Sequence, residues 1–158
     1  SYMDEDRKYL RAAIKIADDA IVEGGGPFGA VITSKGTILA SSSNRVVINH
    51  DPTAHAEILA IREAASLLGT HDLGGCVLYA SCEPCPMCLG AIYWSGIRRV
   101  VYASGRSDAA AAGFDDEHIY NEIALDPGRR KVAFIRKPDE KAREVFRKWT
   151  GYEGRIPY

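Results

Sequence analysis

Three side chains, one imidazole and two thiols, have the identities and the spacing of a metal site. Cys85 and Cys88 lie three residues apart in the run PCPMC at 84–88, and His55 lies thirty residues before Cys85. Zinc is bound by nitrogen and sulfur, and a catalytic zinc keeps three protein ligands and leaves the fourth position to water. With this ligand pattern, a Glu two residues after the His, here Glu57, carries protons and does not bind the metal. The sequence therefore predicts one catalytic zinc per chain.

The two cysteines are expected at the start of a helix over 86–94. Pro86 suits the first helical position, because its missing N–H would have no partner there. Cys85 would then precede the helix and Cys88 would lie in its first turn, with both sulfurs near free backbone N–H groups. That end of a helix lowers the pKa of thiols and favours thiolates.

A second helix is predicted over 55–68, and the spacing of His55 and Glu57 limits where this helix can begin. His55 and Glu57 are two residues apart, so a regular helix would point them to nearly opposite sides. They can share one site only if His55 lies at the helix entrance, before the turn becomes regular. Two helix N-termini would then face one cation.

The remaining elements alternate between helical and strand patterns. Apolar residues at helical spacing predict helices over 4–23 and 138–149. Short apolar runs bounded by turn residues predict strands over 28–33, 38–42, 76–81, 99–103 and 131–136. The run at 76–81 is almost entirely apolar, as in a central strand covered on both faces. It leads to Cys85 at its C-terminal end, where ligand sites of open α/β sheets lie.

Composition limits the classes of partner. The 158 residues suit one domain, over 1–158, and the net charge of −1 gives no general attraction to nucleic acid or to anionic membranes. No secretory signal or membrane-length apolar run is visible, and four cysteines without such a signal predict reduced thiols and a cytoplasmic protein. Residues 129–148 include nine basic and three acidic residues. We interpret this segment as a solvated surface and not as a binding site for a phosphate backbone.

The order of these elements resembles the cytidine deaminase-like zinc fold along almost the whole chain. Within that fold, four segments are similar to the small bacterial guanine deaminases: GGPFGAVI at 25–32, NHDPTAHAE at 49–57, SCEPCPMCLGAIYW at 81–94 and AAGFDDEHIY at 111–120. The resemblance implies a three-layer α/β/α fold with a mixed five-stranded sheet covered by helices on both faces. It also implies one Zn²⁺ per subunit, hydrolysis of guanine to xanthine and ammonia, and a homodimer.

The same resemblance assigns roles to individual residues. It gives zinc to His55, Cys85 and Cys88, and proton transfer to Glu57. Its further assignments are a hydrogen bond to the purine from Asn44, pocket walls at Phe28 and Trp94, a second carboxylate near the leaving amine at Asp116, and a tail over 150–158 that ends at Tyr158 and closes the site. From the sequence alone, Asn44 is as well explained by a turn residue as by a substrate-binding amide. The tail could act in its own subunit or, by exchange, in the partner.

Other functions remain open, among them deamination of another small aminated heterocycle. The tRNA-specific adenosine deaminases share the zinc motifs but have nothing resembling GFDD, whereas plant-type guanosine deaminases share GFDD and differ after it. A further alternative is that the chain is a structural zinc domain, in which a fourth protein side chain binds the metal. Cys82 and His50 are the nearest candidates for this fourth ligand. In such a domain Glu57 would have no function.

Overall fold

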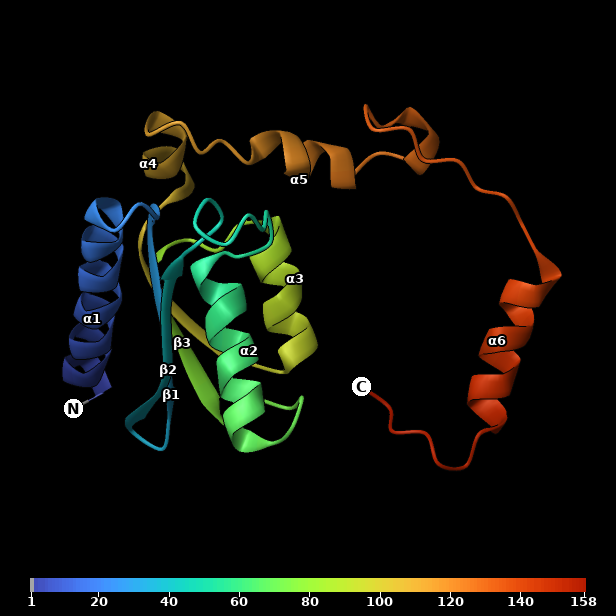
Figure 1. The fold of residues 1–158 in the computed structure, drawn as a ribbon, viewed down its shortest axis with the longest axis horizontal. Coiled ribbons are helices and arrows are strands. Elements are labelled where there is room, and N and C mark those ends of the chain that lie inside the picture. The colour runs from blue at the N-terminus through green and yellow to red at the C-terminus, as the bar shows by residue number, and fades with distance from the viewer. Residues whose placement is uncertain (1) are drawn as a thin grey trace. The chain divides into compact units, whose positions relative to one another are not determined.

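The computed structural model describes residues 2–158, which divide into two compact units, one up to Asp116 and one from Glu117 to Tyr158 (Figure 1). The first unit contains a mixed sheet in the order β2-β1-β3-β4. Strand β1 is antiparallel to both β2 and β3, and β3 is parallel to β4. The strands are β1 (Gly26–Ser34), β2 (Thr37–Asn44), β3 (Cys76–Cys82) and β4 (Arg99–Ser104).

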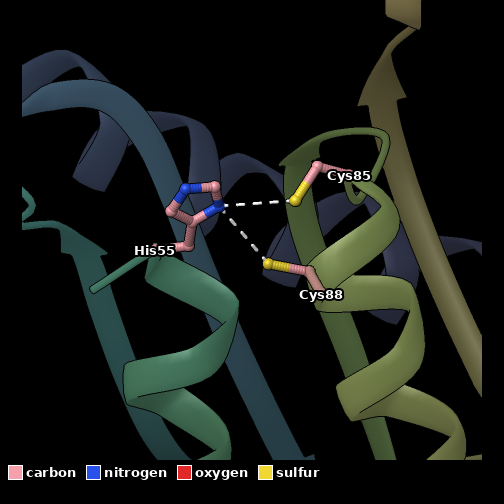
Figure 2. Close-up of side chains that lie close together, drawn as sticks. All are labelled: His55, Cys85 and Cys88. Carbon is pink, nitrogen blue, oxygen red and sulfur yellow. Dashed lines mark hydrogen bonds between the residues drawn. The ribbon is translucent and has the colours of Figure 1, made fainter. Parts of the chain in front are cut away.

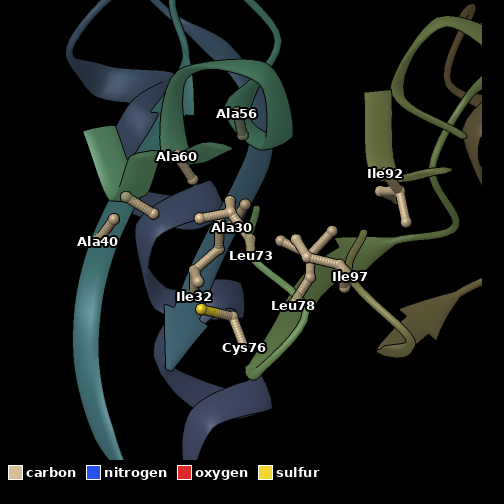
Figure 3. Packing of buried hydrophobic residues seen from close by; sticks show 11 residues of the cluster. Ala30, Ile32, Ala40, Ala56, Ala60, Leu73, Cys76, Leu78, Ile92 and Ile97 are labelled. Carbon is tan, nitrogen blue, oxygen red and sulfur yellow. The ribbon is translucent and has the colours of Figure 1, made fainter. Parts of the chain in front are cut away.

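Helices cover both faces of this sheet, as Figure 1 shows, which confirms the predicted three-layer arrangement. One face packs against α1 (Tyr2–Val22), and the other against α2 (Ala56–Leu68) and α3 (Pro86–Ser95). Successive strand residues point to opposite faces. On the α2 side, Ile32 and Leu78 pack with Ala60 and Ile92 (Figure 3). On the α1 side, the next residues along the strands, Val31 and Tyr79, pack with Tyr9 and Ala13.

Helix α1 is attached to the sheet by a close approach and by a polar cluster. A Cβ atom on Gly29 would lie 2.2 Å from the carbonyl oxygen of Ala13, so only glycine lets the helix approach β1 this closely. Near the N-terminal end of α1, the Arg99 guanidinium donates to the Asp6 carboxylate at 2.8 Å. The Tyr79 hydroxyl donates to the same carboxylate at 2.9 Å. This cluster connects α1 to β3 and β4.

The second unit is helical. It contains α5 (Glu117–Ile123), the short 3₁₀ helix η1 (Pro127–Arg129) and α6 (Glu140–Gly151). The side chain of Asp139 caps α6 by accepting a hydrogen bond from the Lys141 N–H at 2.9 Å. Helix α6 confirms the helix predicted over 138–149. Its apolar residues Val145, Phe146 and Trp149 are all exposed.

The predicted fifth strand over 131–136 is wrong, because the sheet has four strands in the described part of the chain. A strand needs a hydrogen-bonded neighbour, and no strand occurs in the second unit. Local contacts hold the start of this segment instead. The Lys131 N–H donates to the Glu122 carboxylate at 2.8 Å, and the Arg130 guanidinium lies 4.9 Å from the centre of the Phe134 ring. The apolar alternation over 131–136 was therefore not sufficient to form a strand.

Besides the 3₁₀ helix η1, two short α-helices were not predicted. They are α4 (Arg106–Ala111), in the first unit, and α5. Among residues 2–158, no helix combines the length and the apolar character that crossing a membrane requires.

Candidate zinc site

The three predicted ligands come from the entrances of two helices that start next to each other (Figure 2). His55 precedes α2 in an extended conformation, with φ −70° and ψ 153°. Cys85 precedes α3 in a similar conformation, with φ −68° and ψ 172°, and Pro86 takes the first helical position. Both helix entrances are therefore as the sequence predicted, and His55 is free of the helical geometry that would turn it away from Glu57.

The ligand atoms converge on one point. His55 Nδ1 lies 3.4 Å from Cys85 Sγ and 3.5 Å from Cys88 Sγ, and Figure 2 shows both sulfurs facing the imidazole. All three ligand atoms lie within 4.8 Å of one another. Around a tetrahedral zinc, with its typical bonds to sulfur and nitrogen, ligand atoms are about 3.6 Å apart. The nitrogen and two sulfurs thus fit zinc in both chemistry and spacing.

No fourth protein ligand joins this group in the part of the chain that the structure describes. The Cys82 thiol instead donates to the carbonyl oxygen of Gly105 at 3.8 Å. A three-ligand site retains a position for water or substrate, as catalytic zinc sites do and structural ones do not. This geometry argues against the structural zinc domain.

The pKa values of the two thiols are shifted in opposite directions. A hydrogen bond from the Cys88 thiol, assisted by one from His55, lowers the pKa of Cys85 to about 4 although burial opposes it. The neighbouring Cys85 thiolate and burial raise the pKa of Cys88. The hydrogen bond to Cys85 also raises the pKa of His55.

Glu57 lies in the first turn of α2 and is only 7% exposed. Burial raises the pKa of its carboxyl group, and the negative charge on Cys85 adds to this effect, while His55 opposes it. A carboxyl group that holds its proton more tightly than usual suits a group that must both accept and donate a proton near neutral pH. Its position in the same helical turn that follows His55 fits the predicted proton carrier.

Asn44 ends β2 and is 8% exposed. Its side-chain oxygen accepts a hydrogen bond from the Val46 N–H at 3.2 Å, so the residue does shape the turn that follows the strand. Its hydrogen bond to a purine stays a prediction.

Phe28 is half-buried in β1, and its ring meets the Phe114 ring edge-on, with centroids 4.9 Å apart. Both rings line a cavity of about 370 Å³ together with Cys82 and residues of α1 and α4. None of the zinc ligands lines this cavity. The contact attaches the GFDD segment to the start of β1, and the role of Phe28 as a substrate wall stays a prediction.

The three other predicted site residues occupy different surroundings. Asp116 forms an ion pair with Arg106, with Oδ1 and Nε 3.8 Å apart. Trp94 is near the end of α3 and 72% exposed, and Tyr158, in the second unit, is 83% exposed. Their roles at the site also stay predictions. Sequence reasoning missed Arg106, because an arginine that opens a short helix gives no signal of its partner.

The chain belongs to a known zinc-dependent family: residues 3–104 match the cytidine and deoxycytidylate deaminase zinc-binding region. The His55, Cys85 and Cys88 group is the zinc-binding site of such a deaminase. Within the family, the chain is 45% identical over 151 residues to guanine deaminase from Bacillus subtilis (strain 168), a match that covers 95% of this chain and 97% of the relative. An X-ray structure of guanine deaminase from Bacillus subtilis superposes with a TM-score of 0.94 at 44% identity, over 96% of this chain and 98% of that one.

Two further relatives match smaller parts of the chain. A tRNA-specific adenosine deaminase from Bacillus subtilis (strain 168) is 42% identical over 102 residues, which is 65% of this chain and 63% of the relative. A protein solved in complex with 2,6-diaminopurine is 40% identical, with a TM-score of 0.66, over 68% of this chain and 61% of that one.

Proposed function

We propose that this protein is a zinc-dependent guanine deaminase, which hydrolyses guanine to xanthine and ammonia. The observation that carries the proposal is the open three-ligand site with a buried carboxyl group, Glu57, beside it. The choice of guanine is supported by the similarity to a guanine deaminase over 95% of the chain, against 65% for the tRNA-specific relative. The structure of a 40% identical protein in complex with 2,6-diaminopurine supports a purine as the class of substrate.

The proposed reaction assigns distinct tasks to the residues of the site. His55, Cys85 and Cys88 hold the zinc, which when bound activates water for attack on an electrophilic carbon, here C2 of guanine. Glu57 accepts the proton of the attacking water and delivers it to the adjacent ring nitrogen. It then takes the remaining proton from the new hydroxyl group on C2 and carries it to the amino group, so that C2 becomes a carbonyl and ammonia leaves, and not the far more basic amide anion.

The remaining residues recognise and enclose the base in this proposal. Asn44 donates a hydrogen bond to the purine, Phe28 and Trp94 contact its faces, and Asp116 provides a second carboxylate near the leaving amine. A planar base with a polar edge suits aromatic walls combined with a few fixed polar groups. Tyr158, at the end of the tail, closes the site against bulk water.

We also propose a homodimer. Helix α6 exposes Val145, Phe146 and Trp149, and the tail after it exposes Tyr152 and Ile156. A helix whose apolar side is exposed in one chain gains stability when another surface covers it. Exchange of the C-terminal segment between two subunits would provide such a surface and would let the tail act on the partner's site.

The four free thiols agree with a reducing, cytoplasmic location.

An ammonia-release screen tests the proposed substrate. The zinc-loaded protein is assayed with guanine, guanosine, adenine, cytosine, cytidine and a tRNA anticodon stem-loop. We expect the highest kcat/KM for guanine. A value for guanosine equal to or above that for guanine would favour a guanosine deaminase, and turnover of the stem-loop alone would favour a tRNA-specific adenosine deaminase.

A further inference from the structure

The buried side chain of Asn44 lies against a glycine that has no assigned role. Gly26 opens β1 and pairs directly with Asn44 at the end of β2. The pairing of the two strands shifts between Gly26 and Gly29, so the strand is irregular around Pro27 and Phe28. A register shift therefore separates the pair of Gly26 and Asn44 from the regular part of the β1–β2 ladder.

Gly26 leaves the space that the Asn44 carboxamide occupies. A Cβ atom on Gly26 would lie 3.0 Å from Asn44 Cγ, 3.0 Å from Asn44 Oδ1 and 3.3 Å from Asn44 Cβ. These are the three nearest atoms, and all belong to one side chain. The backbone of Gly26 is not in the left-handed region, so alanine is disfavoured there only by this contact. Gly25, the preceding residue, allows the Asn44 backbone to approach in the same way. A Cβ atom on Gly25 would lie 2.5 Å from the Asn44 carbonyl oxygen.

The carboxamide is also fixed in orientation. Its oxygen accepts the hydrogen bond from the Val46 N–H. A carboxamide carries one acceptor oxygen and one NH₂ group with two donors. Because the oxygen is engaged by the backbone, the NH₂ group is the end left to donate to a ligand acceptor, such as a carbonyl oxygen or an unprotonated ring nitrogen of a purine.

We propose that Gly26 is a positioning residue for substrate recognition: the absence of its side chain holds the Asn44 NH₂ group in place to donate to the purine. This inference rests on the proposed function, which gives Asn44 its role as the substrate amide. Asn44 contacts the substrate, whereas Gly26 acts only through Asn44. A methyl group at Gly26 would move the carboxamide by a few tenths of an ångström and misalign that hydrogen bond.

A double-mutant cycle between the two residues tests the proposal. We expect Gly26→Ala to retain zinc, to lower the melting temperature by about 3–10 °C as overpacked sites do, and to lower kcat/KM for guanine about tenfold. In the Asn44→Ala background, Gly26→Ala should change kcat/KM less than about twofold, because the two closest atoms, Asn44 Cγ and Oδ1, are gone. The control is Gly75→Ala, since no atom lies within 4 Å of a Cβ atom at that position.

The proposal would be overturned if Gly26→Ala lowered kcat/KM by the same factor in the wild-type and Asn44→Ala backgrounds. Unchanged kinetics in the Gly26→Ala single variant would also overturn it. If the single variant did not fold, the double variant should fold, and failure of both would equally overturn it. The melting temperatures keep this test separate from the proposed function. A wild-type protein without guanine turnover would refute the proposed reaction, while the coupling in melting temperature would still decide whether Gly26 positions Asn44.

Discussion

At the scale of single residues, Glu57 combines burial with proximity to two thiols and an imidazole. Its carboxyl group is excluded from water, and its pKa is raised by that burial. A buried ionisable group is costly to keep, so it is retained where its proton is used. The conversion of guanine requires two protons to be accepted from the attacking water and two to be delivered, one to the ring nitrogen and one to the amine, and Glu57 is the residue to which we assign these transfers.

Replacement of Glu57 by Gln should abolish most turnover and leave the metal bound. The amide preserves the shape of the side chain but cannot exchange a proton, so kcat should fall about 10²- to 10⁴-fold. Glu63→Gln, at an exposed position of the same helix, is the matched control. Zinc content and steady-state kinetics would be measured for both. A Glu57→Gln protein with more than about a tenth of the wild-type kcat would exclude this residue as the proton carrier.

Replacement of Cys85 by Ala should remove the metal. Three protein ligands hold the zinc, and loss of a thiolate removes both a bond and a negative charge. Cys82→Ala is the control, because the Cys82 thiol lies outside the ligand group. Zinc would be measured by mass spectrometry, with an expected ratio of about one per chain in the wild type and in Cys82→Ala. Full occupancy in Cys85→Ala would contradict the ligand assignment.

The zinc ligands could be predicted from the sequence because their spacing carries the information. Pro86 marks the start of a helix, and the positions of His55 and Glu57 require a helix entrance, so local rules were sufficient. The environment of Asp116 could not be predicted, because its ion pair with Arg106 joins two segments through tertiary structure. The contact between Gly26 and Asn44 depends in the same way on strand register.

At the scale of elements, helix α1 depends on polar contacts at its N-terminal end. The Arg99 guanidinium and the Tyr79 hydroxyl both donate to the Asp6 carboxylate, and the hydrogen bond from Arg99 is the main reason that the pKa of Asp6 is lowered. Burial and the same carboxylate raise the pKa of Tyr79 to about 12, so its hydroxyl stays a donor throughout the neutral range. This cluster should make the attachment of α1 depend on pH.

Asp6→Asn should therefore destabilise the protein at neutral pH but not in acid. The folded-state pKa of Asp6 is below its unfolded value of about 3.9, so its stabilisation is present above that value and disappears as the pH falls through the lower folded value. We expect a melting temperature about 2–4 °C lower than that of the wild type at pH 7 and a difference that vanishes below the folded pKa. Glu23→Gln, exposed just after α1, is the control. A difference that does not depend on pH would contradict this role of the carboxylate.

The long helices and four of the five predicted strands formed as expected, whereas the shortest helices were not predicted. The helices over 2–22 and 56–68 carry enough apolar spacing to be recognised, and Gly69 and Gly96 end α2 and α3 in the left-handed conformation. Helices α4 and α5 have six and seven residues, too few for a periodic pattern. The segment over 131–136 has strand-like alternation, but whether a strand forms depends on a neighbour that the local sequence does not specify.

At the scale of the whole molecule, the segment after α6 exposes several apolar side chains. Tyr152, Ile156 and Tyr158 are all exposed in the described chain. Covering these side chains would stabilise the end of the chain, and Pro157 reduces the entropy lost on ordering it. A lid over the substrate would bury these apolar side chains and would benefit from the smaller entropy loss at Pro157.

Deletion of residues 152–158 should leave zinc content and circular dichroism unchanged while guanine turnover falls at least about tenfold. A site opened to bulk water loses the exclusion that its reaction needs. Tyr158→Ala in the chain without the deletion would show how much of the effect belongs to this residue. Sedimentation of both proteins would distinguish a lost lid from a lost dimer. Unchanged kinetics after the deletion would reduce the tail to a packing role.

The central claim is that this family member hydrolyses guanine at C2 through a zinc-dependent site. The most direct measurement is mass spectrometry of the product formed from guanine in H₂¹⁸O, with metal-free protein as the control. We predict xanthine that carries one ¹⁸O atom, released together with ammonia, and no product from the metal-free protein. Guanine recovered unchanged from the zinc-loaded protein, or xanthine without solvent oxygen, would contradict the claim.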